Sequence, residues 1–434
     1  DYFEEDPMTV MAKLGEHWKP AKHPDLPDAF AGGWVGFAGY DTVRYQYINK
    51  LPFDNVREQD DRDLPDVHMG LYEEVIVFDH ATKQVYGVKW VMLEDYTSKD
   101  GTVDAEKAYS EGIKGLDDLM KELQPETMGT IPFGSVDMRL SGKPEPMKDS
   151  NMSKESFLDA VATTKEHIKA GDIFQLVLSH RFERKTKVDP FEVYRALRVV
   201  NPSPYMIYYQ GKDCILIASS PEILCRVDDS RTVVNRPLAG TRARGKTQAE
   251  DLALEEDLLA DEKERAEHVM LVDLGRNDVG RVSQLGTVKV EKLMEIARYS
   301  HVMHISSTVT GKLIEDLNPW DVLRAALPVG TVSGAPKVRA MQIIDDLEVS
   351  KRGPYGGGIG YVGFAGEMDI ALALRTMVVP TKQKKGDEWT IHVQAGAGIV
   401  ADSNPESEYQ ETVNKSAALG RSIDLAERAF LKKK

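Results

Sequence analysis

Between residues 173 and 400 the chain is dominated by short apolar segments that predict β-strands, with few helices between them. Parallel strands need a crossover connection, usually a helix, whereas antiparallel strands can be joined by tight turns. This ratio predicts an antiparallel, sheet-rich α+β fold rather than a parallel doubly wound one. The strand-like segments are "IFQLVLSHRFER", "YMIYYQG", "CILIASSPEILCRV", "TVVNRPLAG", "TVKVEKLMEI", "HVMHISSTVTG", "GGGIGYVGFAG", "MDIALALRTMVV" and "WTIHVQAGAGIV". Helices are expected at residues 153–171, 248–274, 320–327, 337–347 and 406–429.

The first 145 residues differ from the remainder, because they mix short strands with acidic helices. Residues 32–41 and 73–80 predict strands, and residues 104–123 carry apolar side chains at helical spacing. Residues 124–151 are rich in Pro, Gly and Ser, which is typical of a linker. We therefore expect an N-terminal part, residues 1–145, and a larger core, residues 146–434.

Composition limits the partners of the chain. Its 434 residues include 55 basic and 70 acidic side chains, a net charge of −15, which would repel nucleic acid. No run of 18 apolar residues is present, so no membrane-spanning segment is expected. The two cysteines, Cys214 and Cys225, are too few for a disulfide framework and are expected to be reduced thiols in or near strands.

One stretch suggests a nucleotide site. "GTRARGKT", residues 240–247, matches the phosphate-loop pattern G-x-x-x-x-G-K-[ST], and "VMLVD", residues 269–273, resembles the magnesium-holding strand of such NTPases. Pro237 just before the pattern, the bulky Arg242 and Arg244 inside it and the antiparallel context argue against this interpretation. A P-loop NTPase therefore stays an alternative from another functional class. The literal G-x-G-x-x-G of residues 358–363 is expected to continue as a strand rather than to open a helix.

Two helices each carry a pair of glutamates three residues apart, Glu264 with Glu267 and Glu408 with Glu411. This spacing places both carboxylates of a pair on one helix face. If the two faces meet, their oxygens could hold a hard cation such as Mg²⁺; if they do not, the pairs are solvated acidic faces.

Other residues suggest a site for a small polycarboxylate. The Gly-rich segments "YGGGIG" and "QAGAG" let backbone N–H groups approach a ligand closely, and Arg375 is a cation in an otherwise apolar strand-like segment. His301 and His304 are three apart on a predicted strand and face opposite ways, so they cannot chelate one ion together.

Ten ordered motifs between about residue 153 and residue 430 resemble the chorismate-utilising enzymes, and among them most closely the anthranilate synthase component I chains of plastid type. They are "IKAGDIFQLVLSHRF", "NPSPYM", "SSPEIL", "NRPLAGTRARG", "AEHVMLVDLGRNDVGRV", "VMHISSTVTG", "LPVGTVSGAPKVRAM", "RGPYGGGIGY", "DIALALRT" and "QAGAGIVADS". The resemblance implies a large antiparallel β-sandwich with helices on its outer faces, against which the N-terminal part packs.

The resemblance also implies site residues. It places Mg²⁺ on Glu267 and Glu411, with Glu264 and Glu408 supporting the ion through water. The positions that hold the two carboxylates of chorismate and line its pocket correspond to Tyr355, Arg375, Gly396, Gly398, Lys415, Ala239, Gly240 and Thr241.

Two positions distinguish subfamilies. Aminodeoxychorismate synthases carry a lysine nucleophile where this chain has Ala239, and isochorismate and salicylate synthases carry a general-base lysine where it has Gln175. The nucleophile is therefore expected to be ammonia. Aminodeoxychorismate synthase component I stays the alternative within the family.

The implied reaction is an amination of chorismate followed by elimination of pyruvate, which gives anthranilate for tryptophan biosynthesis. Glu222 corresponds to the acid that protonates the departing C4 hydroxyl, His304 to a histidine linked to the elimination, and Thr331 to a pocket residue.

Partners and location are implied as well. Ammonia is expected from a glutamine amidotransferase subunit, component II. The family's tryptophan effector site includes the loop Asn201, Pro202, Ser203, Pro204, Tyr205 and Met206; its Leu-Leu-Glu-Ser segment does not occur in these residues, so weak inhibition is expected. A tryptophan-sensing module without catalysis is a distant alternative. The plastid stroma is expected, with the leader absent from this chain, or the cytoplasm for a bacterial source.

Overall fold

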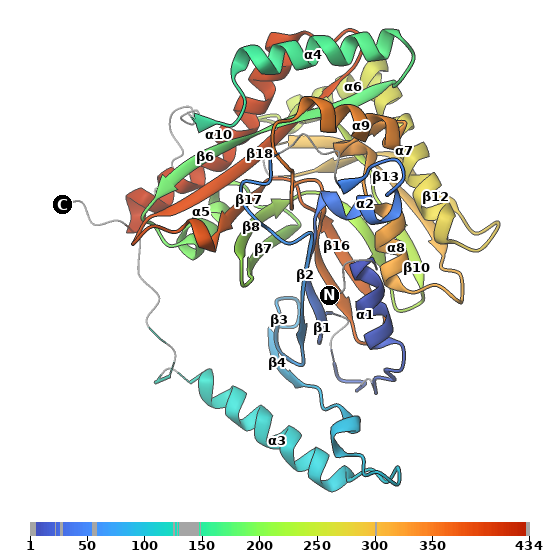
Figure 1. Cartoon of the computed structure of the whole chain (residues 1–434), viewed down its shortest axis with the longest axis vertical. Helices are drawn as coiled ribbons and strands as arrows, with labels where there is room; N and C mark the ends of the chain where they lie inside the picture. The colour runs from blue at the N-terminus through green and yellow to red at the C-terminus, as the bar shows by residue number, and fades with distance from the viewer. Residues whose placement is uncertain are drawn as a thin grey trace.

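Two large antiparallel sheets form the centre of the molecule (Figure 1). The computed structural model describes residues 6–21, 23–26, 29–53, 59–124, 126–127, 129, 147, 149–299 and 302–430. Within these residues a nine-stranded sheet has the order β11-β13-β10-β9-β16-β15-β1-β2, with β12 paired to β13. A seven-stranded sheet has the order β14-β6-β18-β17-β8-β7, with β5 paired to β6, and β3 and β4 form a separate hairpin.

The strands of the nine-stranded sheet are β1 (Gly33–Ala38), β2 (Val67–Tyr72), β9 (Ile223–Val227), β10 (Thr232–Asn235), β11 (Leu238–Ala243), β12 (Lys289–Arg298), β13 (Val302–Lys312), β15 (Gly358–Gly363) and β16 (Met368–Leu372). The seven-stranded sheet contains β5 (Asp149–Ser150), β6 (Gln175–Thr186), β7 (Tyr205–Gln210), β8 (Cys214–Ser220), β14 (Gly334–Ala335), β17 (Thr376–Pro380) and β18 (Trp389–Ile399). The hairpin is β3 (Glu74–Asp79) and β4 (Gln84–Lys89).

The α-helices are α1 (Pro7–Gly15), α2 (Val43–Gln46), α3 (Ala105–Glu122), α4 (Lys154–Lys169), α5 (Pro190–Val200), α6 (Gln248–Ala260), α7 (Glu262–Val282), α8 (Pro319–Ala326), α9 (Lys337–Leu347) and α10 (Pro405–Phe430). Short 3₁₀ turns are η1 (Tyr40–Thr42), η3 (Leu93–Tyr96), η4 (Gly330–Val332) and η5 (Thr381–Gln383).

The two sheets pack face to face. Phe37 of β1 and Ile359 of β15 share one buried cluster with Leu216 of β8 and Val378 of β17, so side chains of both sheets meet in one layer. The opposite face of the nine-stranded sheet packs on α7 and α8, and that of the seven-stranded sheet packs on α5 and α10. The predicted α+β sandwich with helices on its outer faces is confirmed.

Strand alternation decides which residues of β6 face the interior. Leu176 and Leu178 are fully buried against α4 and α9. Because successive side chains point to opposite faces, Gln175 and Val177 point the other way. β18 pairs with β6, with Gly398 opposite Val177, so its glycines lie beside them.

The N-terminal part contributes strands to the large sheet. β1 pairs with β15 in antiparallel register, and β2 continues the sheet beyond β1. α3 packs on the β3–β4 hairpin, and Figure 1 shows this unit projecting away from the sandwich. Most of the predicted linker, residues 130–146 included, lies outside the described residues. The division at residue 145 stays a prediction.

Several sequence-based expectations for secondary structure were wrong. The segment "CILIASSPEILCRV" is two strands in different sheets, β8 and β9, and "TVVNRPLAG" is also two strands, β10 and β11. Residues 248–274 form two helices, because Asp261 takes an extended ψ of 107° and its side chain caps α7, which then continues to Val282. The segment "MDIALALRTMVV" is not one strand: β16 ends at Leu372 in one sheet and β17 begins at Thr376 in the other. The helix α5 was missed between two strong strand signals.

The phosphate-loop match is not a phosphate cradle. β11, which leads into it, is antiparallel to β13, and the following N–H groups already donate to carboxylates of α6. Gly245 N–H donates to Asp251 Oδ1 at 2.9 Å, and Lys246 N–H donates to Glu250 Oε2 at 2.8 Å. The "VMLVD" segment lies within α7 and is not a strand. The structure therefore argues against the NTPase alternative.

Two simpler expectations agree with the structure. Cys214 and Cys225 are buried free thiols in β8 and β9. Of the helices that the structure describes, none is both long enough and apolar enough to cross a membrane.

The close approach of β15 and β16 generates a stability prediction. A Cβ at Gly360 would lie 2.1 Å from the Asp369 carbonyl oxygen, so Gly360→Ala must push the strands apart. We expect Gly360→Ala to lower the free energy of unfolding by at least about 2 kcal/mol in urea denaturation. Gly280→Ala is the control: this exposed site in α7 has no atom near an added Cβ, so a gain of about 0.5–1 kcal/mol is expected. Equal stability of the two variants would contradict the argument.

Candidate active site

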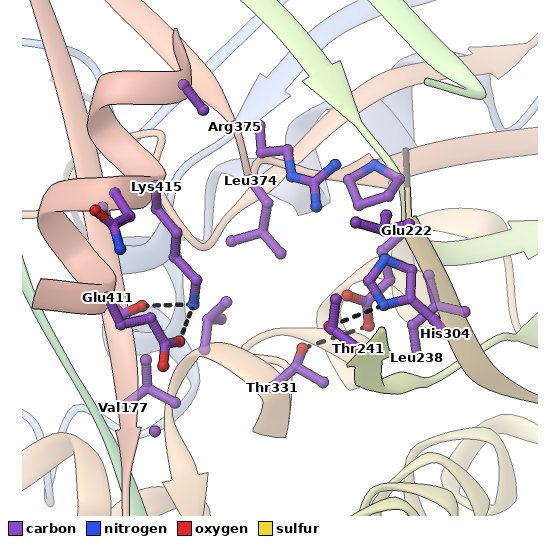
Figure 2. A pocket seen from close by; sticks show the side chains of 18 of the residues that line it. Val177, Glu222, Leu238, Thr241, His304, Thr331, Leu374, Arg375, Glu411 and Lys415 are labelled. Carbon is purple, nitrogen blue, oxygen red and sulfur yellow. Dashed lines mark hydrogen bonds and ion pairs between the residues drawn. The ribbon is translucent and has the colours of Figure 1, made fainter. Parts of the chain in front are cut away.

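A cavity of about 980 Å³ lies where the two sheets, α7 and α10 come together (Figure 2). Most of the sequence-predicted residues line it. They are Gln175, Glu222, Ala239, Gly240, Thr241, Glu267, His304, Thr331, Tyr355, Arg375, Gly396, Gly398, Glu411 and Lys415, together with Asn201, Pro202 and Ser203 of the predicted effector loop. Five predicted residues do not line it: Glu264, Glu408, Pro204, Tyr205 and Met206.

Two adjacent chain crossings between the sheets supply the central residues. Glu222 lies between β8 of one sheet and β9 of the other, and Arg375 lies between β16 and β17. The crossings bond to each other: Leu372 N–H donates to the Glu222 carbonyl at 3.0 Å, and Ser219 N–H donates to the Arg375 carbonyl at 3.1 Å. The backbone thus fixes the acid relative to the cation.

Glu222 is a buried carboxyl that is protonated at neutral pH. Its side chain is 6% exposed, and burial raises its pKa to about 8, against smaller lowering effects of Thr331 and Arg375. Thr331 Oγ donates to Glu222 Oε1 at 3.5 Å, and Figure 2 shows both side chains at the cavity wall. Glu222 can therefore donate a proton to a ligand.

His304 is placed to accept one. Its Nδ1 lies 2.8 Å from the Gly240 carbonyl oxygen and 3.1 Å from Thr241 Oγ. Because a carbonyl only accepts, Nδ1 carries the proton and Nε2 has a free lone pair. Burial lowers the pKa of His304, which keeps the ring neutral.

The two predicted cations differ in their partners. Within the described residues the Arg375 guanidinium has no ion-pair partner, and its backbone is left-handed, with φ of 47°. Lys415 Nζ lies 2.7 Å from Glu411 Oε1 and 3.0 Å from the Gly396 carbonyl. A half-buried arginine without a counter-ion favours an anionic ligand.

Glycines let polar groups approach the cavity. A Cβ at Gly396 would lie 2.8 Å from Tyr355 Oη, and one at Gly398 would lie 2.9 Å from Gln175 Nε2. Burial raises the pKa of Tyr355 to about 12, so its hydroxyl stays a donor. Gln175 Nε2 donates to Glu267 Oε1 at 3.1 Å, and its buried Oε1 has no hydrogen-bond partner.

Two of the four glutamates lie where they could bind a cation in the cavity, and two do not. Glu267 of α7 and Glu411 of α10 line the cavity, whereas Glu264 lies 3.5 Å from Arg242 Nη1. Burial raises the pKa of Glu264, and the nearby charge of Glu267 raises it further. Burial also raises the pKa of Glu408; a hydrogen bond from Ser403 opposes this shift and the charge of Glu411 adds to it. No three His, Cys, Asp or Glu side chains of the described residues are close enough together to hold a metal ion. The donor chemistry nevertheless suits Mg²⁺, which takes one or two protein carboxylates and leaves positions for a substrate.

The predicted effector loop is divided between two environments. Asn201, Pro202 and Ser203 line the cavity, and Ser219 Oγ donates to Ser203 Oγ at 2.9 Å. Tyr205 belongs to β7 and donates from its hydroxyl to Asp369 Oδ1 at 2.7 Å. A tryptophan effector at this loop stays a prediction. His301 lies outside the described residues.

Sequence reasoning missed several lining residues. Gln394 lies two and four residues before Gly396 and Gly398 on β18, so strand alternation could have found it. Tyr299 also lines the cavity, with its ring centroid 5.6 Å from that of His304; it directly follows the end of β12, where no periodic signal exists. Further missed lining residues are Leu238, Leu374, Asn414 and Arg421.

Comparison with known proteins gives a consistent result. Residues 4–421 match the family model described as chorismate binding enzyme. "Anthranilate synthase alpha subunit 1, chloroplastic" of Oryza sativa subsp. indica is 57% identical over 442 residues, covering 99% of this chain and 75% of that protein. "Anthranilate synthase component 1" of Acetivibrio thermocellus is 46% identical, over 98% of this chain and 81% of that protein. The crystal structure of anthranilate synthase component I from Streptococcus pneumoniae TIGR4 matches with a TM-score of 0.79 and 38% identity, over 96% of this chain and 86% of that chain. The chain therefore belongs to the chorismate-binding enzyme family.

Proposed function

We propose that this chain is anthranilate synthase component I and converts chorismate and ammonia into anthranilate, pyruvate and water. The observation that carries the proposal is the placement of a protonated acid, Glu222, and a neutral base, His304, on the wall of one cavity that also holds an unpaired arginine. The relatives that cover nearly the whole chain carry this activity in their names. An acid, a base and a cation are what amination and elimination on a dicarboxylate require.

The first step is substitution of the C4 hydroxyl. Arg375 holds a substrate carboxylate, and Glu222 gives its proton to the hydroxyl, which leaves as water. Ammonia forms the new C–N bond at C2 while the ring double bonds shift, and the added nitrogen then loses a proton. Thr331, which donates to Glu222 Oε1, keeps the carboxyl directed at the cavity.

The second step is an elimination. Nε2 of His304 takes the proton from C2, the electron pair forms the last double bond of the aromatic ring, and the C–O bond to the pyruvyl group breaks. The enol of pyruvate leaves and takes up a proton. Nδ1 keeps its bond to the Gly240 carbonyl throughout, which holds the ring in one tautomer.

We further propose that the enzyme is a Mg²⁺-dependent lyase. Glu267 and Glu411, which line the cavity from two helices, would hold the ion, with Glu264 and Glu408 behind them. When bound, the ion would supply positive charge against the ring carboxylate of the substrate. Lys415, now paired with Glu411, would balance the remaining charge.

Two further lining residues bear on the identity of the nucleophile. Ala239 and Gln175 line the cavity where an amine nucleophile or a lysine base would be needed for the related reactions. Neither side chain can attack or activate water, so ammonia is the reactant. This argument favours anthranilate synthase over aminodeoxychorismate synthase.

We also propose a partner and a location. The relatives are named as component 1 or as an alpha subunit, which supports a second, glutamine-cleaving subunit that delivers ammonia. The name of the Oryza protein includes chloroplastic, which supports a plastid location, and we propose the stroma as its compartment. A bacterial source, as for the Acetivibrio relative, would instead mean the cytoplasm.

A product assay tests the function. The purified chain with chorismate, ammonium and Mg²⁺ should form anthranilate, seen by its fluorescence, and one pyruvate per anthranilate. Glutamine in place of ammonium, or omission of Mg²⁺, should give no product. Isochorismate or aminodeoxychorismate as the final product would exclude the proposal.

Glu222→Gln tests the acid. We expect kcat to fall by roughly 10²–10⁴-fold while calorimetric binding of chorismate changes only a few fold, because glutamine keeps the shape but has no proton to give. The wild-type rate should fall as pH rises past about 8, since the protonated carboxyl is lost there. Glu192→Gln, at a buried glutamate of α5 paired with Arg195, is the control and should leave turnover unchanged. Unimpaired turnover of Glu222→Gln would remove Glu222 from this role.

His304→Asn separates the two steps. Amination should continue, whereas elimination should slow by roughly 100-fold, so the aminated compound that still bears the pyruvyl group accumulates. Chromatography of quenched reactions measures it. His392→Asn changes a buried histidine of β18 that does not line the cavity and should accumulate nothing. A variant of His304 that stops before amination would contradict the assignment.

A further inference from the structure

A fully buried ion pair lies behind the cavity wall, between the end of α9 and Tyr355. Glu348 is 4% exposed and Arg352 is 0% exposed. The Arg352 guanidinium donates two hydrogen bonds to the Glu348 carboxylate, from Nε to Oε2 at 2.9 Å and from Nη2 to Oε1 at 2.6 Å. No step of the proposed reaction uses either residue.

Three further contacts of Arg352 reach the cavity wall, and a fourth is with Tyr40, whose ring centroid lies 4.6 Å from Cζ and which does not line the cavity. Nη1 donates to the Val332 carbonyl at 2.6 Å, and Nη2 donates to the Val177 carbonyl at 2.8 Å. Its Cζ lies 5.7 Å from the ring centroid of Tyr355. Val332, Val177 and Tyr355 all line the cavity, so one side chain joins η4, β6 and the segment before β15.

Glu348 extends the same connection. Its Oε1 accepts from both the N–H and the Oγ of Ser179, each at 2.8 Å. Gln394 Nε2 donates to Ser179 Oγ at 2.9 Å, and Gln394 also lines the cavity. The ion pair therefore joins β18 to β6 as well.

The arrangement controls geometry more than stability. A buried ion pair loses its hydration, so it is often no more stabilising than apolar side chains of the same volume. A guanidinium, however, directs several N–H groups at fixed angles, which a lysine cannot reproduce. Val332 directly follows Thr331, whose hydroxyl donates to Glu222. A shift of Val332 therefore moves the partner of the catalytic acid.

We propose that Arg352, held by Glu348, is a positioning residue for chorismate turnover: it sets Thr331, Val177 and Tyr355 at the distances that the substrate and Glu222 require. The inference rests on the proposed function. A purely structural core pair is the competing explanation, and it would affect stability without a specific effect on catalysis.

The test compares two equally buried arginines. Arg352→Lys loses the two-bond contact with Glu348 and the hydrogen bonds to the Val332 and Val177 carbonyls. Arg44→Lys is the matched control. Arg44 is 1% exposed, binds Asp345 with two bonds, at 2.7 and 2.8 Å, and donates from Nε to Asp41 Oδ1 at 2.9 Å, but neither aspartate lines the cavity. We expect similar falls in Tm for both variants. Only Arg352→Lys should lose about 10- to 100-fold in kcat/KM for anthranilate formation, because small misplacements in a site have effects of this size.

A second variant guards against misfolding. In Glu348→Gln/Arg352→Met the glutamine oxygen still accepts from Ser179, and no buried charge is left unpaired. We expect this variant to fold, to show the same loss in kcat and to have its alkaline limb shifted above that of the wild type, since a displaced Thr331 no longer lowers the pKa of Glu222.

The outcomes separate the two hypotheses. If the wild type forms no anthranilate, the proposed function fails. If the wild type is active and the Arg352 variants, folded at the assay temperature, keep its kcat/KM, or if Arg44→Lys loses as much, Arg352 is a structural residue only and the inference is wrong.

Discussion

The site depends on two places where the chain passes from one sheet to the other. β8 leads into β9 through Glu222, and β16 leads into β17 through Arg375. These crossings lie side by side and bond through backbone groups, and Ser220 Oγ adds a bond to the Leu372 carbonyl at 2.6 Å. Where the chain crosses between the sheets, the regular hydrogen bonding between the strands of each sheet ends. Polar side chains can consequently face a cavity without leaving the sheets unpaired.

Placing an acid at a crossing has a cost in stability. Burial raises the pKa of Glu222 from 4.5 to about 8, so between these values the folded chain holds a proton that the unfolded chain has released. Stability therefore falls as pH rises through this window, the reverse of the effect of a paired carboxylate. Arg375 adds a further penalty, because its half-buried charge has no counter-ion among the residues that the structure describes. The fully buried apolar side chains of the two surrounding sheets stabilise the fold and offset both penalties.

Periodicity alone predicted much of the fold. Most strands and helices follow from spacing, and the antiparallel arrangement follows from the excess of strands over crossover helices. Ser153, where the first of these helices is expected to start, caps α4. The sheet change at Arg375 was not predictable, because "MDIALALRTMVV" is apolar apart from Asp369, Arg375 and Thr376 and contains no Gly or Pro that would mark a break. The roles of the site residues came from family resemblance rather than from spacing. Tyr299 was missed because it lies just beyond β12, outside the strand periodicity. Arg352 was missed because its contacts with Val332 and Val177 join residues distant in sequence.

The phosphate-loop match shows why a local pattern needs its surroundings. Arg242 donates to Asp257 at 2.6 Å and to Asp261 at 2.9 Å, and therefore ties β11 to the corner between α6 and α7. Arg244 holds Asp251 at 2.8 Å and the Tyr299 carbonyl at 2.6 Å. Both arginines of the match are thus already paired with carboxylates within the chain. These ion pairs fix the start of α7, the helix that carries Glu267 to the cavity, so the segment that resembles a nucleotide site supports the wall of a different one.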